Sequence, residues 1–259
     1  MQKRYPIGAI LIIAAICMMC WGSIQTATQQ QLLDDIAYAK AHEVYYITGF
    51  PGMLVELYPQ RDMQNEHHVY DCFIVGLNGH YHRTNWHWNA SLYPDTTEYI
   101  DPPTIYYEDI SQDGQKEIVF VFGDGINNGT GVCLSDSYVI GADGTEYTVE
   151  NPLDYLRTNT SSAISLPDTD IVIDIYTPQQ QYQFRTPQAL WGEPGNISLT
   201  DTGAQAGIPD WVVYHIEDGR LFAEVPFNIF ASGTIGHFNL YYEEIDGAYR
   251  ITSVTCAEY

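Results

Sequence analysis

The sequence predicts a mainly β protein, a β-rich α+β fold of antiparallel sheets and meanders, sandwich- or barrel-like, with one or two short helices. Runs rich in Val, Ile, Tyr and Phe follow one another along most of the chain after residue 50, and such runs are typical of strands. Asp-Gly occurs five times, and Gly accepts the positive φ that a tight hairpin turn requires. No regular alternation of helical and strand patterns is found, which disfavours a doubly wound parallel sheet.

The N-terminus predicts export. Lys3 and Arg4 precede an uncharged apolar run of 18 residues, Ile7 to Ile24, and a polar segment follows. This is the layout of a secretory signal, and the run is just long enough to span a bilayer as a helix. Residues 1–31 are therefore expected to be a signal sequence or an N-terminal membrane anchor with a linker. The rest, 32–259, is expected to be a single β-rich extracytoplasmic domain, secreted or anchored to the outer face of the cytoplasmic membrane.

The predicted elements follow in order. Apolar residues at 32, 33, 36 and 37 fit one short amphipathic helix at the start of the exported part. A second helix is expected at Pro152–Thr158, because Asn151-Pro152 is a favourable start and Asp154 suits the first turn. The strands are expected at Met53–Tyr58, Val69–Leu77, Ile118–Phe122, Ser137–Ile140, Ile171–Tyr176, Trp211–Ile216, Arg220–Val225 and Phe238–Glu243.

Three Asp-Gly pairs lie between predicted strands, at 143–144, 218–219 and 246–247. Each predicts a hairpin, since Asp-Gly flanked by strand-like runs is a strong short-range turn signal. The C-terminal third is therefore expected to be an antiparallel meander. No internal repeat of fixed period is found, which disfavours a full propeller.

The charge of the chain excludes one class of partner. With 33 acidic and 10 basic residues the formal net charge is −23, so nucleic-acid binding through phosphate neutralisation is not expected. The exported part contains Cys72, Cys133 and Cys256. An odd number of cysteines permits at most one intramolecular disulfide, and free buried thiols are the alternative.

One motif has the spacing of a metal site. Asp109, Ser111, Asp113 and Glu117 place oxygen-bearing side chains at positions 1, 3, 5 and 9 of a loop, with Gly114 at position 6. Calcium prefers six to eight oxygen ligands, and a tight loop presents alternate side chains toward one centre. Gln115, at position 7, is expected to add its backbone carbonyl. Position 12 of an EF-hand would be a bidentate Glu but is Phe120 here, so the loop is not an EF-hand.

The stretch Asp109–Phe122 resembles the calcium loop of FG-GAP/VCBS-type repeats, in which an Asp-rich loop runs directly into an apolar strand. The wider segment Tyr106–Tyr155 is similar to uncharacterised exported proteins of Gram-positive bacteria, which also end in a strand-rich tail like Gly236–Val254. The sequence departs from the repeat at Ser111 and Gln112, where Asp or Asn and Gly are usual, and it lacks tandem copies. The resemblance implies an exported location and a metal, and it implies no reaction.

Two weaker constellations leave alternatives open. His80, His82 and His87 lie within eight residues, and His-x-His on a strand can place two imidazoles on one face, as zinc sites do. A polar surface strand explains them equally well. Trp86, Trp88, Trp191 and Trp211, with 21 Tyr, suit either a sugar- or peptide-stacking surface or ordinary core packing.

The sequence therefore predicts a calcium-loop protein that acts by binding a cell-envelope polymer or a surface protein, with no catalysis assigned. The alternative is an extracytoplasmic hydrolase of envelope polymer or carbohydrate, using converging carboxylates or the three histidines. A third possibility is a subunit of a surface assembly, and an exposed apolar patch would be its sign.

Overall fold

The structure is a computed structural model, and it describes residues 28–41, 45–61, 69–89, 102–123, 135–190, 206–229 and 234–258. The chain forms two compact units. Unit 1 comprises Met1–Asp62 with Asp71–Asn85, and unit 2 comprises Met63–Tyr70 with Trp86–Tyr259. The single domain expected over 32–259 stays a prediction, because two compact units can still fold as one cooperative domain.

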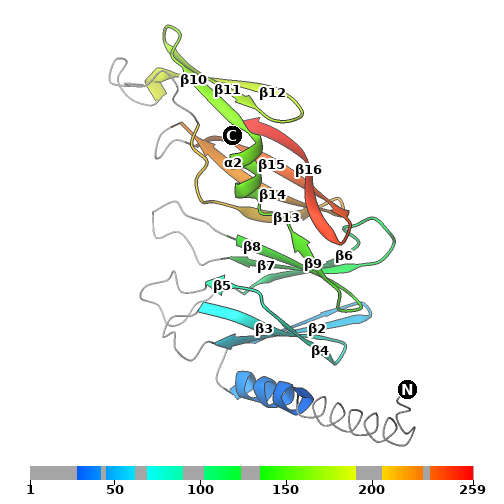
Figure 1. Cartoon of the computed structure of the whole chain (residues 1–259). Coiled ribbons are helices and arrows are strands. Elements are labelled where there is room, and N and C mark those ends of the chain that lie inside the picture. Colours follow the sequence, from blue (N-terminus) through cyan, green and yellow to red (C-terminus); the bar gives the residue numbers. More distant parts are fainter. Residues whose placement is uncertain are drawn as a thin grey trace, which may run out of the picture. The chain divides into compact units, whose positions relative to one another are not determined.

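Unit 1 is built on a sheet in the order β1-β2-β3-β4 (Figure 1). Its strands are β1 (Tyr46–Phe50), β2 (Met53–Arg61), β3 (Val69–Leu77) and β4 (His80–Thr84). β1 pairs antiparallel with β2, and β3 with β4. The turn into β4 uses Asn78 at φ 49° and Gly79 at φ 83°, which is the left-handed geometry that a two-residue hairpin requires.

A helix over residues 28–41 covers one face of this sheet. Its buried residues Ile36 and Ala39 pack against Tyr58 and Ile74 of the sheet. The described part of this helix starts at residue 28, so residues 28–31 of the predicted linker are helical. Leu33 was expected on the inward face but is 46% exposed, because a period of 3.6 residues turns it about 100° away from residue 32.

Unit 2 contains an eight-stranded sheet in the order β13-β14-β15-β16-β9-β8-β7-β6. All its neighbouring strands are antiparallel except β16 and β9, which are parallel. The hydroxyl of Ser135 donates to the carbonyl of Val212 just before β13, so the sheet curls back on itself and is nearly closed. The strands are β6 (Thr104–Glu108), β7 (Glu117–Gly123), β8 (Ser135–Gly141), β9 (Glu146–Val149), β13 (Val213–Glu217), β14 (Arg220–Asn228), β15 (Thr234–Ile245) and β16 (Ala248–Glu258).

A smaller three-stranded sheet, β10-β11-β12, completes unit 2. Its inward residues join those of the large sheet in one core, which includes Ile173, Phe184, Phe227 and Leu240. The remaining elements of the unit are the short strand β5 (Trp88–Asn89), the helix α2 (Pro152–Asn159), the strands β10 (Ser161–Ser165), β11 (Asp170–Tyr176) and β12 (Gln181–Pro187), and the 3-10 turn η1 (Gln188–Leu190).

The predicted fold class is confirmed: the protein is mainly β, with antiparallel sheets, a barrel-like closure and short helices. The C-terminal meander is present as β13 to β16. Asp218-Gly219 and Asp246-Gly247 form its first and last turns with positive φ at all four residues. The second helix begins as predicted, because the Asn151 side chain accepts from the backbone N–H groups of residues 153 and 154.

Among the described residues no helix has the length and apolar character needed to cross a membrane. The predicted signal or anchor run, Ile7 to Ile24, lies outside the described residues. Cys72 and Cys256 are free thiols, and Cys133 also lies outside the described residues.

The thiol of Cys256 is expected to resist alkylation in the folded protein. Burial raises its pKa to about 12, so at pH 8 only about one thiol in ten thousand is the reactive thiolate. Treatment with iodoacetamide at pH 8, followed by peptide mass spectrometry, should label Cys256 slowly in buffer and rapidly in denaturant. Equal labelling rates in the two conditions would contradict this prediction.

Candidate metal centre

The loop between β6 and β7, residues 109–116, is folded back on itself by its own backbone. Gln112 has φ 62° and Gly114 has φ 91°, and this left-handed geometry allows the sharp turn. The carboxylate of Asp109 accepts from the N–H of Gly114 at 3.0 Å, and that of Asp113 accepts from the N–H of Gln115 at 2.7 Å. These two bonds fix both carboxylates against the loop.

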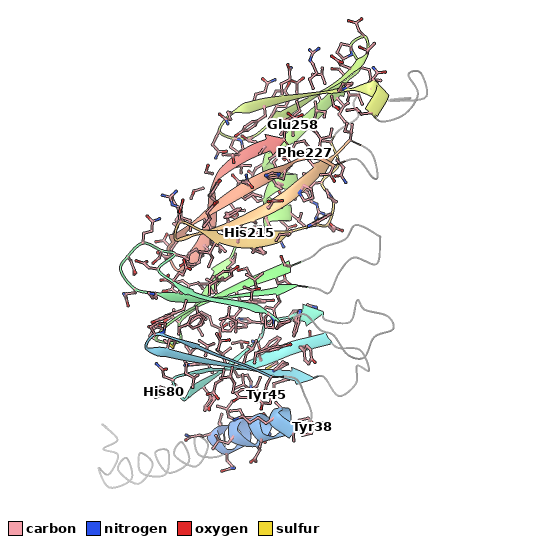
Figure 2. The ribbon with its side chains drawn as sticks, turned by 180° about the vertical axis from the view of Figure 1, so that it is seen from behind. Tyr38, Tyr45, His80, His215, Phe227 and Glu258 are labelled. Carbon is pink, nitrogen blue, oxygen red and sulfur yellow. The ribbon has the colours of Figure 1, made fainter. Side chains whose placement is uncertain are left out.

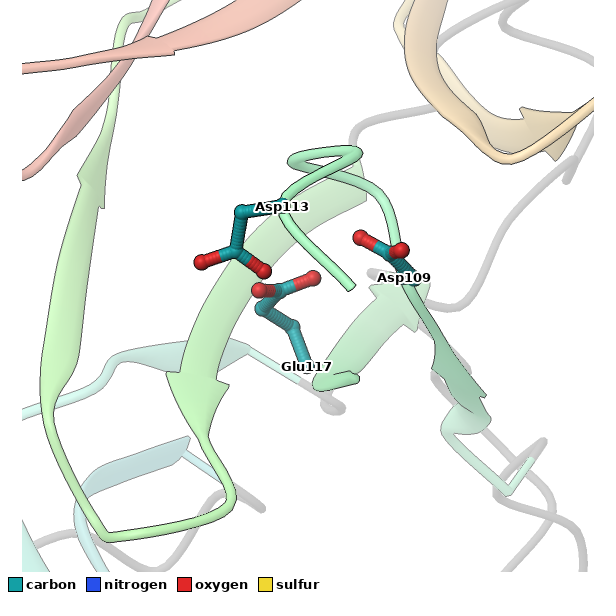
Figure 3. A group of neighbouring side chains, drawn as sticks. All are labelled: Asp109, Asp113 and Glu117. Atoms are coloured by element: carbon teal, nitrogen blue, oxygen red, sulfur yellow. The ribbon is translucent and has the colours of Figure 1, made fainter. Parts of the chain in front are cut away.

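Three carboxylates gather at this loop. Asp109, Asp113 and Glu117 each offer an oxygen, and the three oxygens lie within 4.8 Å of one another (Figure 3). Asp113 is exposed, Asp109 is half-buried, and Glu117, the first residue of β7, is only 3% exposed. Like charges this close repel one another strongly, and more strongly when one of them is buried.

Glu117 is held from the start of the loop. One of its oxygens accepts from the N–H of Ile110 at 2.9 Å, and the other accepts from the hydroxyl of Ser111 at 3.0 Å. Burial raises the pKa of Glu117, the hydrogen bonds from residues 110 and 111 oppose this shift, and the charge of Asp113 adds to it. The pKa is raised overall, so an ionised Glu117 costs the folded protein free energy unless a cation compensates it.

No protein cation compensates the group within the described part of the chain. The ion pairs found there join Arg83 to Asp35, Arg157 to Asp210 and Arg185 to Asp170. Lys116, which belongs to the loop itself, instead lies over the ring of Tyr107 at 5.0 Å. The Oδ1 atom of Asp109 is buried and has no hydrogen-bond partner, although buried polar atoms normally have one.

Two tyrosines from distant strands lie near the carboxylates. Burial raises the pKa values of Tyr147 on β9 and Tyr249 on β16, and the negative charge of Glu117 raises both further. The Tyr249 hydroxyl is buried without a hydrogen-bond partner. Sequence reasoning missed both residues. Tyr147 reaches the carboxylates through the β8–β9 hairpin beside β7, whereas Tyr249 reaches them only through the parallel pairing of β16 with β9, which nothing near it in the sequence marks.

The predicted site residues are thus placed as follows. The structure brings together the three carboxylates, and Ser111 contacts them as a hydrogen-bond donor to Glu117. Gln115 donates to Asp113 through its backbone N–H and its side-chain amide. The assignment of its carbonyl, and of Ser111, as metal ligands stays a prediction. The candidate metal-ligand atoms are all oxygens, which is the ligand type that calcium prefers.

The three histidines do not lie in one unit. His80 and His82 are on β4 of unit 1, whereas His87 belongs to unit 2 and donates its backbone N–H to the Tyr138 hydroxyl. His80 and His82 line an open groove of about 1260 Å³ between β4 and the helix over residues 28–41. Among its described lining residues the one carboxylate is Asp35, and it is paired with Arg83.

Two of the four tryptophans considered for stacking are core residues. Trp86 is 5% exposed and Trp88 is 1% exposed. Trp86 stacks on Tyr138 with ring centroids 4.9 Å apart, and Trp88 packs against Phe122 at 5.3 Å. Trp191 lies outside the described residues. Core packing, and not a ligand-stacking surface, therefore accounts for Trp86 and Trp88.

No family model, curated protein or solved structure matches this chain. Fold and site alone therefore define its class. It is a β-rich protein with a nearly closed barrel-like sheet, and it carries a three-carboxylate group where a short loop enters one of the strands.

Proposed function

We propose that this is an extracytoplasmic protein, secreted or held by its N-terminal segment, whose 109–117 loop binds calcium and which acts by binding a cell-envelope polymer or surface protein. The observation that supports the metal is the group Asp109, Asp113 and Glu117, with oxygens within 4.8 Å and no compensating Lys or Arg among the described residues. A divalent cation would relieve the repulsion between the carboxylates. It would also give the unpartnered Asp109 oxygen a partner.

The ion's role in this proposal is structural. It would fix the loop that leads into β7, a strand paired on both sides within the large sheet. The loop also borders the β13–β14 turn, since a Cβ built on Gly219 would lie 3.4 Å from the Asp109 carbonyl oxygen. Ordering the loop would therefore stiffen two neighbouring connections of unit 2.

The experiment is thermal unfolding of the purified protein in calcium and in chelator, with and without Asp113→Asn. The parent should unfold at a higher temperature in calcium, by an amount that grows with calcium concentration, because the ion binds only the folded state. Asp113→Asn should abolish this shift. Asp246→Asn is the matched control, since it replaces another Asp of an Asp-Gly turn and should retain the shift.

A second readout uses the tyrosine rings near the carboxylates. Terbium, which replaces calcium at oxygen sites, should luminesce when the protein's tyrosines are excited, and calcium should compete with it. The emission should fall in the Asp113→Asn variant. A parent protein with the same melting temperature in calcium and in chelator, and with no terbium emission, would reject the calcium proposal.

The hydrolase alternative has weaker support. It requires converging carboxylates in a cleft or a metal held by the three histidines. The described lining of the groove that contains His80 and His82 offers one carboxylate, Asp35, and that carboxylate is already paired with Arg83. The carboxylates that do converge lie in the loop before β7, where Glu117 accepts hydrogen bonds from the loop itself.

A further inference from the structure

The charge of the chain is divided very unequally between the two units. Unit 1 contains 6 of the 33 acidic and 5 of the 10 basic residues, so its formal net charge is −1. Unit 2 contains the other 27 acidic and 5 basic residues, so its formal net charge is −22. An anionic surface would repel unit 2 and leave unit 1 almost unaffected.

Exposed apolar side chains are divided in the opposite way. Of the eight large hydrophobic residues that are exposed among the described residues, five belong to unit 1, the smaller unit. They are Leu33 (46%), Tyr38 (49%), Tyr45 (41%), Ile47 (52%) and Leu54 (42%). Single exposed apolar residues are ordinary, but a concentration of them in one small unit indicates a contact surface.

These side chains lie on one side of unit 1. Ile47 pairs with Glu56 across β1 and β2, so alternation places Ile47, Leu54 and Glu56 on the same sheet face as Tyr58. That face carries the helix, because Tyr58 packs against its residue Ile36. Leu33 and Tyr38 lie on the helix itself, where Figure 2 labels Tyr38, and Tyr45 stacks on Tyr58 with ring centroids 5.7 Å apart.

The sequence connects this side to a membrane. The apolar run predicted as a signal or anchor ends at Ile24, and the described helix begins at residue 28. We propose that the helix over residues 28–41 and the adjoining face of β1 and β2 form a membrane-contact surface, through which unit 1 rests on the outer face of the cytoplasmic membrane. This inference depends on the proposed function in one respect, the retained N-terminal anchor.

The chemistry of the surface suits a bilayer interface. Tyr38 and Tyr45 combine an apolar ring with a polar hydroxyl, as residues at the headgroup level do. Lys40 extends from the helix over the Tyr58 ring at 5.1 Å, and its charge is favourable near anionic headgroups. A tethered surface needs little affinity of its own, because the anchor keeps it near the bilayer.

The test uses the full chain in vesicles of phosphatidylcholine and phosphatidylglycerol that contain a photoactivatable phosphatidylglycerol. After irradiation, mass spectrometry should find lipid cross-links in peptides covering residues 28–41 and 45–58 as well as in the N-terminal segment. The equally exposed Tyr176 and Ile245 of unit 2 should remain free of lipid. Replacing Ile47 and Leu54 by Ser should lower cross-linking of β1 and β2 about tenfold, whereas Ile245→Ser should not change it.

The possible failures can be told apart. Cross-links confined to residues 1–27, in protein that floats with the vesicles, would overturn the contact surface and leave the anchor intact. Protein that does not float with the vesicles would overturn the anchor and the contact surface together. If a bifunctional photoreactive cross-linker added to the same vesicles joins residues 45–58 to a second copy of the chain, and the lipid does not label these residues, another protomer covers this face and the lipid assignment is overturned.

Discussion

Replacement of Glu117 by Gln is expected to remove the stabilisation by calcium without weakening the calcium-free protein. In calcium at 100 times its Kd, the ion stabilises the parent by about 2.7 kcal/mol, and the variant should lose this gain. In chelator, the introduced glutamine keeps an acceptor for the N–H of Ile110 and carries no charge next to Asp113. The unfolding free energy of the variant in chelator should therefore equal or exceed that of the parent.

The pH dependence of this difference has a definite sign. In the metal-free protein, in chelator, the pKa of Glu117 lies above its ordinary value, mainly because of burial. Between the ordinary and the raised pKa the unfolded chain releases this proton before the folded protein does, so stability falls as the pH rises through that window. The Glu117→Gln variant lacks this titratable carboxyl group. In chelator, the unfolding free energy of the variant minus that of the parent should therefore grow from low pH up to the raised pKa and then stay constant.

Denaturant titrations of both proteins at several pH values, in calcium and in chelator, measure these free energies. Glu258→Gln, at the exposed end of β16, is a charge-matched control that should keep the calcium effect. A Glu117→Gln variant that calcium stabilises as much as the parent would mean that Glu117 is not a ligand. One that is much less stable than the parent in chelator would mean that its charge is compensated by something other than a metal.

Replacement of Gly236 by Ala is expected to cost about 3 kcal/mol of stability, at the upper end for an overpacked core. A Cβ at this position would clash with the carbonyl oxygen of Ala257 and would lie 2.8 Å from the ring of Phe227. The first contact is with the backbone of β16, the strand paired with β15 along most of its length. The clash can therefore be relieved only by moving the strand.

Gly49→Ala is the control, because a Cβ there meets nothing within 4 Å on the edge strand β1. Its unfolding free energy should change by well under about 1 kcal/mol. The comparison is made by urea titration in chelator, so that metal binding does not contribute. A Gly236→Ala variant as stable as the Gly49→Ala variant would contradict the packing of β15 against β16 described above.

Features that depend on adjacent residues were predicted well. The turns at Asp218-Gly219 and Asp246-Gly247 and the helix start at Asn151 are where the sequence places them, because each depends on the conformational preference or the hydrogen bonds of two or three neighbours. The loop from Asp109 to Glu117 is in the same category, since all three carboxylates lie within nine consecutive residues.

Features that depend on distant residues were not predicted. Tyr249 approaches Glu117 only through the parallel pairing of β16 with β9 in the large sheet, and no local pattern specifies that pairing. The outward position of Leu33 was also missed, because residues 32 and 33 both fit the apolar stripe of the helix, and only the position of the sheet decides which of them is covered. The assignment of His80 and His82 to one unit and of His87 to the other was not predicted either.

The sequence by itself determined the β-rich class, the hairpin turns and the position of one acidic loop. Each of these follows from backbone preferences and residue spacing over a few residues. Only the tertiary structure decided that Glu117 is buried beside Asp109 and Asp113, and that five of the eight exposed large apolar side chains among the described residues belong to unit 1. The physical reason is that burial, repulsion between charges and exposed apolar area depend on which distant segments share a sheet face, and chain order does not specify this.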